Sequence, residues 1–253
     1  MRGLFKENCL DTLKRMLTES IDLTVTSPPY DALRKYNGYS FDFETIARQL
    51  FRVTKIGGVV IWVVGDSTKN GTESLTSFKQ ALYFNKIGFN VHDTMIYQKK
   101  NYVPLNHSRY EQCFEYIFVF SKGSPKTFNP IMVACKYPGK MESYGIGRRQ
   151  NFGVNHSMRS YEKSISKPTK EFKVHPNIFS YTTGKNRTGH PAPFPQELAQ
   201  DMILSFSNEN DIVYDPFCGS GTVPKVCILN NRKWIASEIS SEYCGIILKR
   251  ISF

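Results

Sequence analysis

The sequence predicts an α/β fold with a mostly parallel sheet, one antiparallel strand and a loop-rich insert. Short apolar runs rich in β-branched residues alternate with segments of helical periodicity before residue 121 and again after residue 188. The run Glu115–Ser121 has no room for a helix before it, so we expect it to pair antiparallel to its neighbour. Between residues 122 and 187, prolines and glycines break the periodicity, which indicates an insert.

Hydrophobic spacing assigns the elements of the first half. Helices are predicted over residues 8–19, 43–55 and 74–87. We expect the second of them to stop at Gly57-Gly58, which would form its C-terminal cap. Strands are predicted over residues 23–26, 59–64, 91–97 and 115–121. Residues 59–64 are continuously apolar, which is typical of a strand buried on both faces.

The second half repeats the alternation. The predicted elements are a helix over 196–206 entered at Pro195, a strand over 212–214, a helix over 223–230, a strand over 234–237 and a helix ending near Lys249. We therefore divide the chain into residues 1–121, 122–187 and 188–253, with the first and last segments forming one domain around the insert.

Length and composition limit the class of protein. The 253 residues suit one large domain with an insert, and the 40% of apolar residues are enough for a sizeable core. No apolar run approaches a membrane span, and the polar N-terminus argues against a secretory signal. Six scattered cysteines without a Cys-x-x-Cys pair favour reduced thiols in a cytoplasmic protein over disulfides or a metal site.

The positive charge is concentrated in the insert. The chain has a net charge of +11, and residues 121–190 contain 13 Lys or Arg against three acidic residues. Tyr, Phe and Asn are interleaved with these basic residues, and such a block favours a surface that binds a polyanion. A solvated, partly disordered insert is the alternative.

The stretch Thr26-Ser27-Pro28-Pro29-Tyr30 ends the predicted strand 23–26. Prolines cannot donate to a sheet ladder, so the chain must leave the strand here. The residues before the two prolines are restricted to extended geometry, which holds their carbonyl oxygens in a rigid array. Rigid acceptors beside an aromatic ring suit a planar amine. Taken alone, the same stretch is also compatible with an ordinary Pro-Pro turn.

A glycine-containing loop, Asp215-Pro216-Phe217-Cys218-Gly219-Ser220-Gly221-Thr222, connects a predicted strand to a helix. Its glycines let the backbone approach a ligand closely, and Glu238, 17 residues after Gly221, is placed to accept the two hydroxyls of a ribose. The Gly-Lys-Ser/Thr ending of a phosphate loop and the third glycine of a dinucleotide site are both missing. A nucleoside with an amino-acid tail, S-adenosylmethionine, fits these features. The alternative is a tight turn and a surface glutamate.

Three motifs together resemble the amino-group DNA methyltransferases. They are Ser-Pro-Pro-Tyr early, His-Pro-Ala-Pro-Phe-Pro from His190, and Asp-Pro-Phe-x-Gly-Ser-Gly-Thr from Asp215. Their order matches the β arrangement of that family. The resemblance implies a Rossmann-like, S-adenosylmethionine-dependent methyltransferase sheet. It also implies a catalytic half (1–121), a basic target-recognition insert (122–187) and a cofactor-binding half (188–253).

The resemblance implies roles for individual residues. Asp215 is expected near the cofactor's ammonium, Glu238 at its ribose, Phe194 closing over it, and Asn8 where the family often has an acid near the adenine. The loop that cradles the cofactor comprises Phe217, Cys218, Gly219, Ser220, Gly221 and Thr222. The catalytic turn comprises Ser27, Pro28, Pro29 and Tyr30.

The expected chemistry follows from the target. An exocyclic amine of a base is a poor nucleophile because its lone pair is delocalised into the ring. Ser27 Oγ and the Pro28 carbonyl can accept hydrogen bonds from the two N–H groups of this amine, while Tyr30 stacks on a base flipped out of the duplex. Positioning and charge complementarity carry the rate, without a covalent intermediate or a metal ion.

We therefore predict a DNA methyltransferase acting on the N4 amine of cytosine, since Ser before Pro-Pro-Tyr is usual for cytosine enzymes of the family. N6-adenine methylation, an RNA or protein amide methyltransferase, and a non-enzymatic DNA-binding module are the alternatives. The expected partner is double-stranded DNA, bound by a monomer or homodimer, with a restriction endonuclease as a further candidate partner. The predicted DNA contacts, of which the two lysines can equally be solvated surface, are Lys99, Lys100, Arg148, Arg149 and Arg159.

Overall fold

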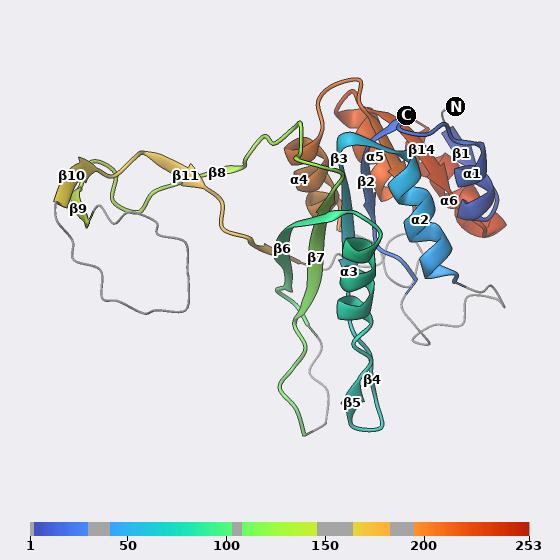
Figure 1. Cartoon of the computed structure of the whole chain (residues 1–253), viewed down its shortest axis with the longest axis horizontal. Coiled ribbons are helices and arrows are strands. Elements are labelled where there is room, and N and C mark those ends of the chain that lie inside the picture. Colours follow the sequence, from blue (N-terminus) through green and yellow to red (C-terminus); the bar gives the residue numbers. More distant parts are fainter. Residues whose placement is uncertain (1–2, 30–40, 103–107, 146–163, 183–194, 253) are drawn as a thin grey trace. The chain divides into compact units, whose positions relative to one another are not determined.

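The computed structural model describes residues 3–29, 41–102, 108–145, 164–182 and 195–252 (Figure 1). The chain forms two units, of which unit 1 comprises residues 1–129 and 176–253 and unit 2 comprises residues 130–175. Tyr30, Phe194, Arg148, Arg149 and Arg159, all predicted site residues, lie outside the described residues.

Unit 1 is built on an eight-stranded sheet, and one of its strands is antiparallel, as the sequence predicts. β7 (Phe114–Ser121) runs antiparallel to both of its neighbours, β3 and β6, and every other pair in the sheet is parallel. The strand order is β1 (Gly3–Phe5), β14 (Lys233–Ser237), β13 (Ile212–Asp215), β2 (Ile21–Thr26), β3 (Thr54–Val64), β7, β6 (Asn90–Lys99) and β12 (Ile178–Tyr181).

The helices of the described part of unit 1 form two groups. In the first group, α2 (Phe43–Val53) contacts both α1 (Cys9–Arg15) and α3 (Thr76–Lys86), and in the second group α5 (Thr222–Leu229) contacts both α4 (Gln196–Phe206) and α6 (Ser241–Ile251). Figure 1 shows α2 and α3 in front of the sheet and α4 and α5 behind it. The arrangement is the α/β fold that the alternation of strands and helices predicts.

Local sequence explains where the helices begin. Asn8 Oδ1 accepts from the backbone N of Leu10 at 2.9 Å, Asp42 Oδ1 accepts from Thr45 N, and Ser240 Oγ accepts from Tyr243 N. These side chains satisfy backbone N–H groups that have no partner within their helix. Pro195 stands at the N-cap of α4, as expected of a residue with no N–H to satisfy.

The core lies where the continuous apolar run predicts it. All residues of 59–64 in β3 are at most 1% exposed, so the strand is buried on both faces. Trp62 packs edge-on against Phe84 of α3, with ring centroids 5.1 Å apart, and its indole nitrogen donates to Gln80 at 2.8 Å. This cluster also receives Phe217 from the glycine loop, whose ring lies 6.2 Å from Trp62.

Two predicted helix ends are wrong. α1 ends at Arg15 rather than near residue 19, because Met16 is already extended and the following turn docks on the end of α2. α2 ends at Val53, and Gly57-Gly58 lie inside β3 rather than forming a cap. β3 is irregular there, because Ile21 pairs with Thr54 but Leu23 pairs with Val59. Gly57, with φ +82°, provides the bend, and its N–H donates to the Lys122 carbonyl.

Four strands of unit 1 lie outside the predicted elements. β1 and β12 add one strand to each edge of the sheet, and β4 (Thr68–Lys69) and β5 (Thr72–Glu73) form a separate hairpin. Each has only two to four residues, which is too short for an alternation of polar and apolar residues to be recognised. β12 lies within residues 122–187, so part of the segment predicted as the insert belongs to the main sheet.

Unit 2 is a two-stranded ribbon in its described part. β8 (Met132–Ala134) pairs antiparallel with β11 (Phe172–Val174), and β9 (Met141–Gly145) pairs antiparallel with β10 (Ser164–Pro168). The described lysines of this ribbon are Lys136, Lys140, Lys167, Lys170 and Lys173. Its short strands and long connections agree with a loop-rich insert, whereas the functional division at residues 121 and 188 stays a prediction.

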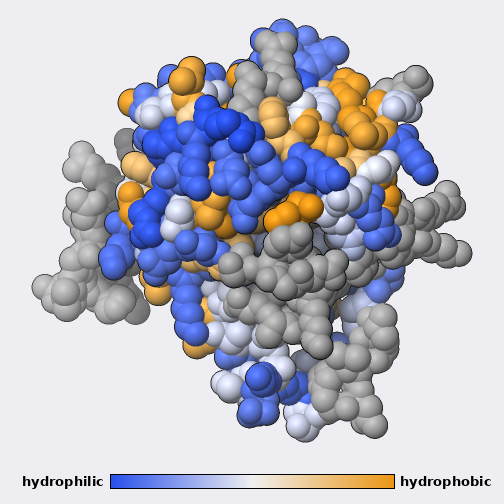
Figure 2. Space-filling model, turned by 90° about the vertical axis from the view of Figure 1, so that its right-hand side faces the viewer, coloured by the Kyte–Doolittle hydropathy of each residue, from blue (hydrophilic) through white to orange (hydrophobic). Residues whose placement is uncertain are grey.

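Three further observations concern the residues that the structure describes. No helix among the described residues is long and apolar enough to cross a membrane. Figure 2 shows a largely hydrophilic face with smaller hydrophobic patches. All six cysteines fall within the described residues and are free thiols.

Candidate active site

The predicted motifs meet at one edge of the sheet. β2, β13 and β14 are parallel neighbours, so their carboxyl ends lie together. β2 ends at Thr26, β13 at Asp215 and β14 at Ser237, immediately before the Ser27 turn, the glycine loop and Glu238. Ligands of open α/β sheets bind at this edge.

The Ser27 turn leaves β2 as predicted. Ser27 and Pro29 are half-buried and Pro28 is buried. Thr26 pairs with Trp62 of β3, so the sheet fixes the backbone up to the residue before Ser27. Ser27 therefore begins at a point on the edge of the sheet that the pairing of β2 with β3 fixes.

A buried hydrogen bond joins this turn to the glycine loop. Thr26 Oγ1 donates to Asp215 Oδ1 at 2.8 Å, and both residues are at most 4% exposed. Asp215 Oδ1 also accepts from the backbone N of Phe217 at 3.1 Å, which folds the start of the loop back over the carboxylate. Asp215 Oδ1 therefore connects the end of β2 with the start of the glycine loop.

The protonation of Asp215 depends on its burial. Burial raises the pKa of this carboxyl from 3.8 to about 7, and the nearby Glu238 carboxylate acts in the same direction. The hydrogen bonds from Thr26 and Phe217 oppose the rise in pKa, because they favour the anion. A carboxyl group with this pKa is poised to become an anion when a cation is placed beside it.

The glycine loop uses glycine where no other residue would fit well. Gly219 and Gly221 have φ of +53° and +79°, in the left-handed region. A Cβ on Gly221 would lie 3.1 Å from Cγ2 of Ile247 in α6, so the loop packs closely on that helix. Cys218 N donates to the Ser237 carbonyl at 3.0 Å, which ties the loop to the end of β14.

Glu238 organises the far side of the loop. Its Oε2 accepts from Gly219 N and its Oε1 accepts from Ser240 N, each at 2.8 Å. Burial raises the pKa of Glu238, and the backbone hydrogen bonds from Ser240 and Gly219 lower it. Each oxygen of the carboxylate has capacity for another donor, so the group fits a ligand with two adjacent hydroxyls.

Arg250 supports the same loop and was not predicted as a site residue. It lies in the last turn of α6, and its Nη1 donates to the Ser220 carbonyl at 3.2 Å and to the hydroxyls of Ser220 and Thr222 at 3.0 Å each. Burial lowers the pKa of its guanidinium. In the sequence, a basic residue there is typical of a solvated helix end, so no signal distinguished it.

Comparison with known proteins identifies the family. A family model described as DNA methylase, which groups N6 and N4 methyltransferases, matches residues 21–249. The chain belongs to this DNA methylase family. It is 51% identical over 241 residues to the orphan methyltransferase M.BamHII of Bacillus amyloliquefaciens, covering 92% of this chain and 89% of that protein. This level of identity over nearly the whole chain supports the same assignment.

Solved structures show the same fold. The cytosine-N4-specific PvuII DNA methyltransferase superposes with a TM-score of 0.73 at 20% identity, over 99% of this chain and 86% of that chain. The protein TTHA0409 of Thermus thermophilus, complexed with S-adenosyl-L-methionine, gives a TM-score of 0.65 at 21% identity, over 99% of this chain and 95% of that chain. The fold of this DNA methyltransferase is therefore the Rossmann-like fold predicted from the motifs.

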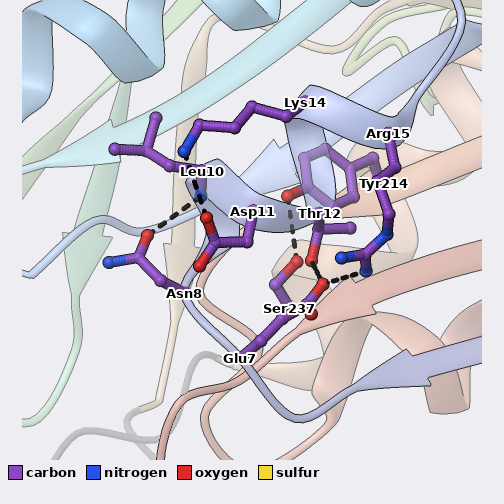
Figure 3. Close-up of polar contacts among 9 residues, drawn as sticks. All are labelled: Glu7, Asn8, Leu10, Asp11, Thr12, Lys14, Arg15, Tyr214 and Ser237. Atoms are coloured by element: carbon purple, nitrogen blue, oxygen red, sulfur yellow. Dashed lines mark hydrogen bonds and ion pairs between the residues drawn. The ribbon is translucent and has the colours of Figure 1, made fainter.

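Asn8 has a structural task in this DNA methyltransferase. Figure 3 shows its side chain capping α1, and the preceding Glu7 accepting hydrogen bonds from Thr12 and Arg15. Asn8 is half-buried and follows β1, whose end lies beside that of β14. Its amide group stays a predicted contact for the adenine.

The two described candidates for DNA contact differ from each other. Lys99 Nζ lies 2.6 Å from Glu115 Oε1, so this lysine is paired within the sheet. Lys100 is exposed at the end of β6, and its backbone N donates to the Tyr181 carbonyl. Of the two lysines, Lys100 has the side chain that is better placed for DNA.

The described residues fit S-adenosylmethionine better than a metal ion. Asp215, Glu238 and the glycine backbone supply acceptors for an ammonium and a ribose and a cradle for the atoms between them. No group of three or more His, Cys, Asp or Glu that could hold a metal is found among the described residues.

Proposed function

We propose that this DNA methyltransferase transfers a methyl group from S-adenosylmethionine to the exocyclic N4 amine of a cytosine flipped out of duplex DNA. The hydrogen bond between Thr26 and Asp215 is the observation that carries the proposal. It holds an acceptor-rich turn for the amine beside a loop that suits the methyl donor.

The residues around the glycine loop would hold the donor. Asp215 faces the ammonium, Glu238 accepts the ribose hydroxyls, and the backbone from Phe217 to Thr222 encloses the atoms between them. S-adenosylmethionine, when bound, supplies the methyl group as part of a sulfonium cation. The fold shared with TTHA0409, whose structure is complexed with this molecule, supports this choice of donor.

The Ser27 turn would hold the acceptor. Ser27 Oγ and the Pro28 carbonyl accept hydrogen bonds from the two N–H groups of the target amine. These bonds draw the nitrogen lone pair out of conjugation with the base ring. Because the turn is fixed by β2 and by two prolines, little reorganisation is needed at the moment of reaction. Tyr30 is proposed to stack on the flipped base.

The basic ribbon of unit 2 would contribute binding energy for DNA. Removing a base from the stack costs a few kcal/mol. Contacts between lysines and phosphates can offset this cost, and they make the affinity dependent on salt. We propose the insert as the source of sequence recognition, with Arg148, Arg149 and Arg159 among its contacts.

N6-adenine methylation is the second candidate. Its target is also an exocyclic amine with two N–H groups, and the matching family groups both activities. Two observations favour cytosine. This chain has Ser at the position before Pro-Pro-Tyr, and the PvuII enzyme that shares its fold is named as cytosine-N4-specific.

The product identifies the activity directly. The protein is incubated with methyl-labelled S-adenosylmethionine and unmethylated duplex DNA of mixed sequence, and the DNA is digested to nucleosides. We expect the label in N4-methylcytosine. Label in N6-methyladenine alone would replace the cytosine proposal, and label in an RNA or protein control but not in DNA would overturn both.

The cellular setting is part of the proposal. We propose that the enzyme acts in the cytoplasm on double-stranded DNA, as a monomer or homodimer. A restriction endonuclease that cuts the same sequence would be a functional partner. Light scattering of the free enzyme and of its DNA complex distinguishes the two oligomeric states.

A further inference from the structure

A small hairpin extends from the edge of the sheet that holds the candidate active site. β3 ends at Val64, and Thr26 of β2 pairs with Trp62, so β3 continues two residues past that level. Two residues of strand span about 7 Å. The hairpin of β4 and β5 follows, and Figure 1 shows it pointing away from the sheet beside the connection between β6 and β7. It thus lies at the same edge of the sheet as the Ser27 turn.

The hairpin is held rigidly although it has no apolar core. Its turn residues, Asn70 and Gly71, have φ of +53° and +77°, which suits the tight turn of a two-residue hairpin. At its base, Ser74 N donates to the Ser67 carbonyl at 2.8 Å. A two-stranded hairpin alone is marginally stable in water, so these fixed contacts are needed to keep it formed.

Arg109, from the connection between β6 and β7, braces the tip. Its Nη2 donates to the Gly71 carbonyl, and its Nη1 lies 3.8 Å from Glu73 Oε1. The next residue, Tyr110, is fully exposed. Two separate segments therefore form one projection, the edge finger, which we define as residues 68–73 together with residues 109–110.

The exposed groups of the edge finger are of the kinds that proteins use to contact nucleic acid. Thr68, Lys69, Thr72 and Glu73 are all exposed, and none is apolar. Lys, Arg, Thr, Asn and Tyr side chains are among the groups that contact phosphates and sugars in protein–DNA complexes. The only acidic side chain in the finger, Glu73, is already paired with Arg109, which reduces its repulsion of phosphates.

We propose that the edge finger is a second DNA-binding element, separate from the basic insert, and that it contacts the duplex next to the flipped base. Lys69 contacts a phosphate, Tyr110 packs against an exposed sugar or base, and Arg109 holds the two segments together. The inference rests on the proposed DNA methyl transfer but not on the identity of the methylated base.

The test compares the double variant Lys69→Gln/Tyr110→Ala with a matched control, Lys86→Gln/Leu82→Ala. The control residues are exposed in α3, and α3 ends at the opposite edge of the sheet. Methyl transfer to unmethylated duplex DNA of mixed sequence is measured at several salt concentrations. We expect the finger variant to raise KM for DNA about fivefold to tenfold with kcat within about twofold, and to lower the salt slope by about one. The control should match the wild type.

Arg109→Ala tests separately whether the contacts of Arg109 with Gly71 and Glu73 matter for DNA binding. We expect this variant to raise KM for DNA to a similar extent. The inference is overturned if the wild type methylates DNA and both finger variants keep its KM and salt slope. A lower melting temperature with an unchanged KM would show a purely structural hairpin and would also overturn it. Failure of the wild type to methylate DNA would instead overturn the proposed function. If the double variant does not fold, Lys69→Gln alone decides by the same criteria.

Discussion

Thr26 Oγ1 and Asp215 Oδ1 lie 2.8 Å apart, although the two residues are separated by 189 positions in the chain. The bond forms because β2 and β13 are adjacent parallel strands that both end at this point. It joins the residue before the proposed amine-binding turn to the first residue of the proposed cofactor loop. The relative position of the two motifs is therefore fixed within the buried core.

The first prediction concerns this hydrogen bond. Thr26→Val keeps the shape of the side chain but leaves the buried Asp215 carboxyl without one of its donors. We expect a loss of about 1–3 kcal/mol in the free energy of unfolding, measured by denaturant titration, and a lower rate of methyl transfer. Thr26→Ser retains the hydroxyl and should keep most of both. Equal stability and rate in the Val and Ser variants would show that the bond is unimportant.

The second prediction concerns the charge of Asp215. Its pKa in the folded protein is about 7, above the ordinary 3.8, so folding favours the protonated form. This contribution to stability is complete below about pH 4 and is lost as the pH rises to about 7. Asp215→Asn is neutral and can accept the same two hydrogen bonds. We expect the wild type to lose about 1 kcal/mol per pH unit relative to this variant between pH 5 and 7.

Cofactor binding should follow the opposite trend with pH. The ammonium of S-adenosylmethionine attracts the Asp215 anion, so the affinity of the wild type, measured by calorimetry, should rise between pH 6 and 8. Asp215→Asn should bind more weakly at pH 8 and vary less with pH. An affinity of the variant equal to that of the wild type at pH 8 would contradict the role of Asp215 at the ammonium.

The third prediction concerns Arg250. Arg250→Met keeps an apolar stem but removes three hydrogen bonds to Ser220 and Thr222. We expect KM for S-adenosylmethionine to rise about tenfold with kcat within about twofold, because the loosened loop would lose about 1.4 kcal/mol of cofactor binding, which is only part of what these hydrogen bonds contribute to holding the loop. Lys249→Met, at an exposed neighbouring position, is the matched control and should leave both constants unchanged. A fall in kcat alone would place Arg250 in the chemical step instead.

The parts of the fold with strong hydrophobic patterns could be predicted from the sequence. The run 59–64 and the helix 196–206 occur where their apolar spacing places them, and the short connection before β7 correctly indicated its antiparallel direction. The irregular start of β3 could not be predicted, because a Gly-Gly pair after a helical pattern has the same composition as a helix cap. β1 and β12 are edge strands whose pairing depends on distant parts of the chain.

The candidate site could likewise be predicted only in part from the sequence. The glycine loop and Glu238 are recognisable because their spacing along the chain is tied to one strand–helix–strand unit. Arg250 and the buried role of Thr26 depend on contacts across the fold, which no local pattern reveals. Asn8 caps a helix, a task for which asparagine is a common choice, so its sequence position alone does not distinguish capping from a ligand contact.

The division of roles between the two motifs is the central claim, and Ser27→Ala tests it most directly. Cofactor affinity is measured by calorimetry, and methyl transfer to saturating duplex DNA is measured in a single turnover. We predict that transfer falls at least about a hundredfold, as expected when a positioned polar group is removed from the reacting centre, while S-adenosylmethionine affinity stays within about twofold. Unchanged transfer, or a loss of cofactor affinity as large as the loss of transfer, would contradict the account.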